Sequence, residues 1–207
     1  MKRLIFDLDN TLILWKNEYR EAMRKTVEHF NLNLDYITLD DLVEKYEEYY
    51  DKYTIDNMTE LFNTKFNTNL TNEFTEYWLN ELGKMAEDDL NIKPLLEYLS
   101  KKYELVILTN WFKKSQLNRL KKIGIDKYFS KIYSGEDFIK PSKESYLKVI
   151  ENKDIKDCIM IGDNLKVDIE GAVNIGLKAI LVDIKDKYLD SAEYIRIKNI
   201  HELKEIL

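Results

Sequence analysis

The chain has 207 residues, a net charge of −6, six glycines and only two prolines. This length accommodates one domain of ordinary size with an insertion, and the scarcity of glycine and proline excludes long flexible linkers. The acidic balance excludes the broad basic surface that binding to a nucleic-acid backbone requires. The single cysteine, Cys158, excludes an internal disulfide framework and any paired-cysteine metal site.

Apolar runs in this sequence are short. None approaches the roughly 18 residues expected of a membrane-spanning helix, and the amino terminus has only a brief strand-like run behind one lysine and one arginine. We therefore predict neither membrane insertion nor secretion, and we expect the protein in the reducing cytoplasm.

Four of these runs predict strands buried on both faces of a parallel sheet, because they lack polar alternation. They cover residues 3–6, 104–108, 158–161 and 178–183. Helical patterns at 94–103, 113–124 and 142–152 lie between them, with Pro94 in a first turn, Gly124 at an end and Ser142 at a start. Alternation of strands and helices predicts an α/β core.

Residues 16–90 interrupt this alternation with four amphipathic helix patterns and no strand pattern, which predicts an all-helical insertion. We place the core at 1–15 and 91–207. Three apolar stripes are expected to form the centre of a helix bundle, with Thr71 capping the last helix. Their members are Tyr19, Ala22, Met23, Val27 and Phe30; Leu39, Leu42, Val43, Tyr46 and Tyr53; and Phe74, Tyr77, Trp78, Leu82 and Met85.

Polar residues follow three of the predicted strands. Asp7 and Asp9, in the stretch "LIFDLDNTL", follow the first strand, while Thr109 and Asp163 follow two others. Because ligands bind outside the carboxyl ends of the strands in open α/β sheets, we expect these side chains to converge. An all-oxygen cluster of this kind suits Mg²⁺.

Two simpler interpretations of "DLDNT" remain. Asp, Asn and Thr all favour a strand-end turn. Counted as a calcium loop from Asp7, the sequence places Asp9, Thr11 and Glu18 at the third, fifth and twelfth positions, but Leu12 stands where such a loop needs glycine. A strand also precedes the loop, where an EF-hand has a helix.

Four ordered segments, "FDLDNTL", "LTNW", "KPSKESY" and "IGDNLKVDIEGAVNIG", resemble the four motifs of the haloacid dehalogenase superfamily. The inserted helices resemble the cap that its phosphatase branch carries after the first motif. This resemblance implies a doubly wound, Rossmann-like parallel sheet with an inserted helical cap. It further implies a Mg²⁺-dependent phosphatase that hydrolyses a small phosphorylated metabolite through an aspartyl-phosphate intermediate.

Carried onto this sequence, the resemblance makes Asp7 the nucleophile and Asp9 the general acid and base. The second aspartate separates phosphoryl transfer from dehalogenation, since the dehalogenases of the superfamily lack it. Thr109, Asn110 and Lys140 would bind the phosphoryl group.

The same resemblance assigns the metal ligands. Asp7, the backbone carbonyl of Asp9, and Asp163 would hold Mg²⁺. Asp168 would hold either the metal or Lys140 in place.

Alternatives share part of this pattern. A phosphomutase of the same superfamily would use every residue named above. A non-catalytic phosphoacceptor receiver also presents acidic residues, Thr and Lys-Pro in this order, but receivers place the acceptor on a middle strand and have no helical insertion after the first. A third alternative is an inactive member whose cap serves as a binding surface.

The sequence leaves the substrate and the oligomeric state open. Residues close behind the motifs are candidates to face the substrate: Trp15, Lys16, Tyr19, Arg20 and Trp111. Lys113, Lys114, Lys121 and Lys122 are interpreted as a solvated helix face.

Overall fold

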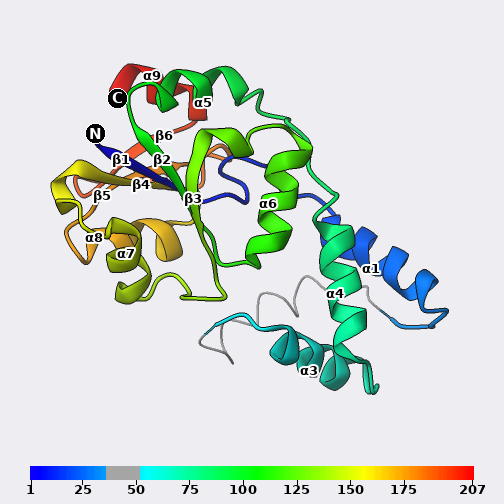
Figure 1. Ribbon diagram of the computed structural model, residues 1–207. Helices are drawn as coiled ribbons and strands as arrows, with labels where there is room; N and C mark the ends of the chain where they lie inside the picture. The colour runs from blue at the N-terminus through cyan, green and yellow to red at the C-terminus, as the bar shows by residue number, and fades with distance from the viewer. Residues whose placement is uncertain (36–51) are drawn as a thin grey trace.

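The computed structural model describes residues 1–35 and 52–207, and its centre is a six-stranded sheet (Figure 1). The strand order is β3-β2-β1-β4-β5-β6, and every neighbouring pair is parallel. The strands are β1 (Arg3–Phe6), β2 (Glu104–Leu108), β3 (Phe129–Tyr133), β4 (Cys158–Gly162), β5 (Lys178–Val182) and β6 (Ile195–Ile197). The predicted α/β class with a doubly wound parallel sheet is confirmed.

Helices cover both faces of this sheet. In β1, Leu4 and Phe6 point to one apolar cluster and Ile5 to the other, as the two-residue period of a strand requires. The first cluster includes side chains of α5 (Lys93–Ser100), α6 (Lys113–Lys122) and α9 (Leu203–Ile206). The second includes side chains of α7 (Lys143–Ile150) and α8 (Gly171–Val173).

The predicted core elements are present, with two additions. β1, β2, β4 and β5 match the four predicted strands, and Pro94 lies in the first turn of α5. Gly124 follows α6 with φ of +70°, and the Ser142 side chain caps α7 by accepting a hydrogen bond from the Ser145 amide. β3 and β6 were not predicted. Both are edge strands with polar, partly exposed residues, so neither shows a continuous apolar run.

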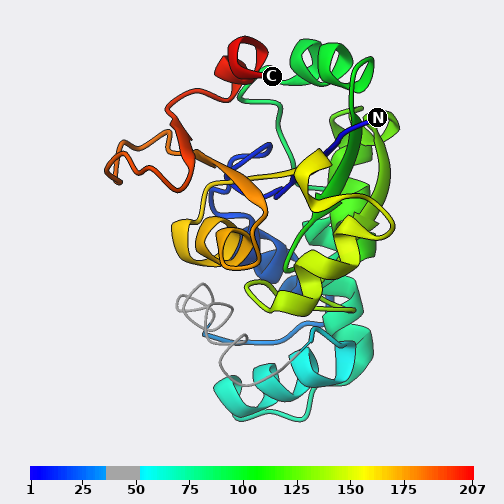
Figure 2. The same ribbon diagram turned by 90° about the vertical axis from the view of Figure 1, so that its left-hand side faces the viewer.

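The insertion contains three described helices, α1 (Glu18–His29), α3 (Ile55–Phe66) and α4 (Asn72–Leu82), which lie outside the sheet core, with α4 beside α6 (Figures 1 and 2). They pack around the fully buried ring of Trp78. Thr71 precedes α4 as predicted, but its side chain makes no capping hydrogen bond. Met85, predicted on the α4 stripe, lies beyond the end of the helix.

The predicted stripes of the first and last cap helices are buried at Ala22, Met23, Val27, Phe74, Trp78 and Leu82. The second predicted helix, with Leu39, Leu42, Val43 and Tyr46, lies outside the described residues, whereas Tyr53 of its stripe is described and buried. The domain limits stay a prediction. Packing changes from the cap cluster at Met85 to the core cluster at Ala86.

Within the described residues, 1–35 and 52–207, no helix combines the length and the apolar character needed to cross a bilayer.

Candidate active site

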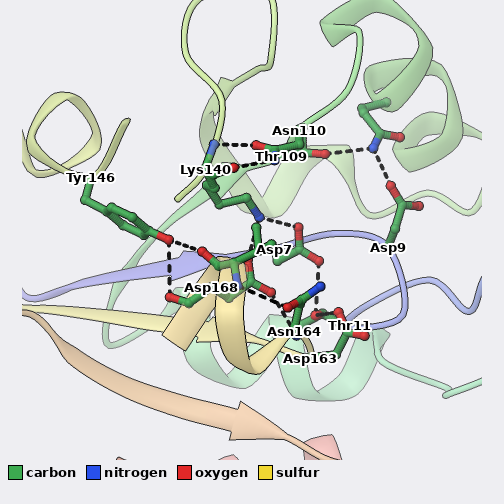
Figure 3. Close-up of polar contacts among 12 residues, drawn as sticks. Asp7, Asp9, Thr11, Thr109, Asn110, Lys140, Tyr146, Asp163, Asn164 and Asp168 are labelled. Carbon is green, nitrogen blue, oxygen red and sulfur yellow. Dashed lines mark hydrogen bonds and ion pairs between the residues drawn. The ribbon is translucent and has the colours of Figure 1, made fainter. Parts of the chain in front are cut away.

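The polar residues predicted to converge do lie together, at the carboxyl edge of the sheet (Figure 3). Asp7, Thr109 and Asp163 follow β1, β2 and β4, and β1 lies between the other two strands. The chain crosses from one side of β1 to the other between β3 and β4, so this edge is the topological switch point where open α/β sheets bind ligands.

A buried ion cluster occupies the centre of this edge. The Lys140 ammonium donates to Asp7 Oδ1 at 2.7 Å and to Asp168 Oδ1 at 2.6 Å. The other Asp168 oxygen accepts from the Asn164 amide at 3.1 Å. Gly162 makes this approach possible, because a Cβ on it would lie 2.4 Å from Asp168 Oδ2. Asp168 therefore holds Lys140 against Asp7, one of the two arrangements that the sequence allowed.

Asp163 joins the cluster through the Thr11 hydroxyl. The Thr11 hydroxyl lies 3.2 Å from Asp7 Oδ2 and 3.4 Å from Asp163 Oδ1. Asp7, Asp163 and Asp168 each offer a carboxylate oxygen, and these oxygens lie within 4.8 Å of one another.

Burial dominates the ionisation of these groups. It raises the pKa of Asp7 well above its ordinary value, and the carboxylates of Asp168, Asp163 and Asp9 raise it further against the opposing effect of Lys140. Burial raises the pKa of Asp163 to about 7, again with a contribution from Asp168. For Lys140, burial alone lowers the pKa, but Asp168 and Asp7 raise it above its ordinary value, so the ammonium stays charged.

The donor set fits a divalent cation. Three carboxylates lie together beside the Lys140 ammonium, and burial opposes the ionisation of Asp7 and Asp163. A hard cation with oxygen ligands is the partner that would keep Asp7 and Asp163 ionised there.

Asp9 points away from this cluster, toward α6. Its carboxylate accepts from Gln116 Nε2 at 2.7 Å and forms an ion pair with the Arg119 guanidinium. Sequence reasoning missed both partners. A signal was present, since Gln116 and Arg119 precede the apolar Leu120 and Ile123 by four residues each and so lie on the inward face of the helix.

Asn110, predicted to bind the phosphoryl group, contacts the backbone of Lys140. Its side-chain oxygen accepts from the Lys140 amide at 2.7 Å, and its nitrogen donates to the Lys140 carbonyl at 2.9 Å. These two bonds fix the loop between β3 and α7 that carries Lys140. A role of Asn110 toward substrate stays a prediction.

A cavity of about 480 Å³ opens over the cluster. Its wall combines the charged residues with four aromatic side chains and Lys16, the aromatic ones being Trp15, Tyr19, Tyr53 and Trp111. Of the candidates that follow the motifs, Trp15, Lys16, Tyr19 and Trp111 thus line the cavity, and Arg20 does not.

Comparison with known proteins identifies one family. Residues 4–182 match the model of the haloacid dehalogenase-like hydrolases. Human N-acylneuraminate-9-phosphatase is 27% identical over 86% of this chain and 81% of its own length. Glyceraldehyde 3-phosphate phosphatase from Pyrococcus abyssi is 26% identical over 87% of this chain and 80% of its own.

A solved structure is similar as well. The putative HAD-hydrolase YfnB from Bacillus subtilis, crystallised bound to magnesium, superimposes with a TM-score of 0.74 at 25% identity, covering 99% of this chain and 97% of that one. The chain belongs to the haloacid dehalogenase-like hydrolase family. Its relatives place it in the phosphatase branch of that family.

Proposed function

We propose that this phosphoric monoester hydrolase acts on a small phosphorylated metabolite, with Mg²⁺, through an aspartyl-phosphate on Asp7. The observation that carries the proposal is the buried contact between Asp7 and Lys140 at the floor of the cavity. Two relatives named as phosphatases of small phosphorylated compounds support it.

In the first step, an Asp7 carboxylate oxygen attacks phosphorus while the bond to the leaving oxygen breaks. Asp9 gives that oxygen a proton. In the second step, Asp9 removes a proton from water, the water oxygen attacks phosphorus, and the bond to Asp7 breaks. Inorganic phosphate leaves and both aspartates return to their starting state.

The surrounding residues stabilise charge during both steps. The Lys140 ammonium, held by Asp168, faces the nucleophile, and the Thr109 hydroxyl lines the same cavity. Asp7, Asp163 and the carbonyl of Asp9 would hold Mg²⁺, which when bound supplies positive charge to the phosphoryl oxygens. Asp168 lies close enough to support that set.

The cavity supports a substrate of modest size. About 480 Å³ is within the range of small-molecule sites. Tyr19 and Tyr53, from the insertion, form part of the wall above the ion cluster. We propose that the insertion acts as a cap that selects the substrate and excludes water from the first step.

The test is phosphate release from a panel that contains N-acylneuraminate 9-phosphate, glyceraldehyde 3-phosphate, hexose phosphates and nucleoside monophosphates, with Mg²⁺ or with chelator. We expect one chemical class to be hydrolysed with a clearly higher kcat/KM, and chelation to abolish turnover. Undiminished turnover after chelation would contradict the metal role. Conversion of a sugar phosphate into its isomer without phosphate release would instead identify a phosphomutase.

A further inference from the structure

Gln116 and Arg119, on the inward face of α6, are polar residues that the proposed mechanism does not use. Both side chains are fully buried, although burial of an arginine or an amide is costly without partners. Their partners are residues of the candidate site, which makes their placement informative.

Arg119 fixes the orientation of the Gln116 amide. Its Nη1 donates to Gln116 Oε1 at 2.8 Å, and a guanidinium can only donate. The amide oxygen of Gln116 must therefore face Arg119, so the amide nitrogen faces the opposite side.

That nitrogen contacts two site residues. Gln116 Nε2 lies 2.7 Å from Asp9 Oδ2 and 2.9 Å from Thr109 Oγ1. Because the Thr109 hydroxyl accepts from Gln116, its own hydrogen remains to be donated, and Thr109 lines the cavity where a phosphoryl oxygen would accept it. The opposite amide orientation would make Thr109 the donor to Gln116.

Arg119 also contacts both segments that connect the core to the cap. Its Nε donates to the Met85 carbonyl at 3.1 Å, and its guanidinium carbon lies 4.6 Å from the centre of the Trp15 ring. Its ion pair with Asp9 then sets where that carboxylate rests.

We propose that Gln116 and Arg119 are positioning residues: Arg119 orients the amide of Gln116, and this amide holds the Asp9 carboxylate and directs the Thr109 hydroxyl to donate toward the phosphoryl group. The inference rests on the proposed function, because it concerns the reaction of the same site.

Two variants of nearly equal shape test it. Gln116→Met removes the donor, and Gln116→Glu keeps the acceptor for Arg119 but replaces the donor by an oxygen. Lys121→Met, at an exposed position of the same helix, is the matched control. The measurements are kcat and KM on an alkyl phosphate and on p-nitrophenyl phosphate, with the melting temperature of each variant.

We expect both Gln116 variants to lower kcat on the alkyl phosphate by roughly 10- to 100-fold with little change in KM, since a misdirected donor costs about this much. The loss on p-nitrophenyl phosphate should be smaller, because its leaving group needs no proton from Asp9. Arg119→Lys should retain less than half of the wild-type kcat. Lysine keeps the positive charge, but it cannot contact the Gln116 amide oxygen and the Asp9 carboxylate in the same planar arrangement.

Wild-type kcat in both Gln116 variants, or equal losses on the two substrates, would overturn the inference. Asp7→Asn is assayed in parallel. If Asp7→Asn is inactive while the Gln116 variants are unaffected, only this inference fails; if Asp7→Asn retains activity, the proposed function fails and this inference with it.

Discussion

The sheet core and the helical cap are packed with different side chains and contribute different parts of the candidate site. Aliphatic residues fill both faces of the sheet, whereas the cap packs around aromatic rings that include Phe62, Phe74 and Trp78. Every motif residue lies in the core, while the cap supplies Tyr19 and Tyr53 to the cavity wall. Because the core and the cap pack separately, we expect substitutions in the core to lower kcat and substitutions at the cap contact to change substrate selectivity.

The largest expected effect is in the core. Asp7→Asn should lower kcat on every substrate by at least about 10³-fold, because an amide is a poor nucleophile. The fold should persist, since Lys140 keeps its contact with Asp168. Phosphate release and melting temperature measure the two outcomes, with the exposed Asp157→Asn as control. Activity within tenfold of wild type on any substrate would contradict the covalent route.

A second substitution in the core should act on turnover without touching a reacting group. In Gly162→Ala the new Cβ would lie 2.4 Å from Asp168 Oδ2, so the carboxylate must move and release Lys140. We expect kcat to fall by roughly 100-fold, the usual cost of displacing a catalytic group by about 1 Å, while KM changes less. A change in KM alone would show that Asp168 does not position Lys140.

The matching substitution at the cap contact is Gly135→Ala. The new Cβ would lie 2.5 Å from the ring of Tyr53. The backbone amide of Tyr53 also donates to the Gly135 carbonyl, at 2.7 Å. Displacement of Tyr53 alters the cavity wall, so KM for the preferred substrate should rise by roughly tenfold, as for other changes of pocket shape. Hydrolysis of p-nitrophenyl phosphate should change little. A kcat loss as large as that of Gly162→Ala would contradict the division between core and cap.

The smallest effect concerns stability and pH. Burial raises the pKa of Asp163 to about 7 in the folded state, so between pH 4 and pH 7 the folded protein holds a proton that the unfolded chain has lost. With chelator present, the contribution of Asp163 should therefore lower the free energy of unfolding as pH rises. The slope should be less than about 1.4 kcal/mol per pH unit, because Asp163 is partly exposed.

Thermal unfolding at pH 5, 6 and 7 in chelator measures this contribution as the difference between wild type and Asp163→Asn. Mg²⁺ should reduce the difference, since it favours the ionised form. Gly135→Ala should keep the pH dependence of wild type, because Asp163 belongs to the core and Gly135 does not contact it. A difference that grows in favour of wild type with rising pH would contradict the raised pKa.

Apolar runs in the sequence predicted the four inner strands but not the two edge strands, and one physical reason explains both outcomes. β1, β2, β4 and β5 have neighbours on both sides and helices on both faces, so their residues are almost all apolar. β3 and β6 are edge strands with a neighbour on one side only, so their residues are less buried. Polar residues are therefore tolerated there: Ser130 and Lys131 in β3 are exposed, and β6 contains Arg196. Pairing with the sheet, rather than local pattern, makes these segments strands.

In the site, the sequence by itself determined the residues whose position follows directly from a strand end: Asp7, Thr109 and Asp163. Strand ends in a parallel sheet meet at one edge, so their convergence required only the fold class. Only the tertiary structure decided the partners of Asp9. Arg119 belongs to a segment that resembled a solvated lysine-rich face, and its burial depends on Trp15, Met85 and Asp9 meeting around it. Helical spacing places Arg119 on the inward face of α6, but its contacts come from two segments far away in the chain, around residues 9–15 and at Met85, so local spacing does not encode them.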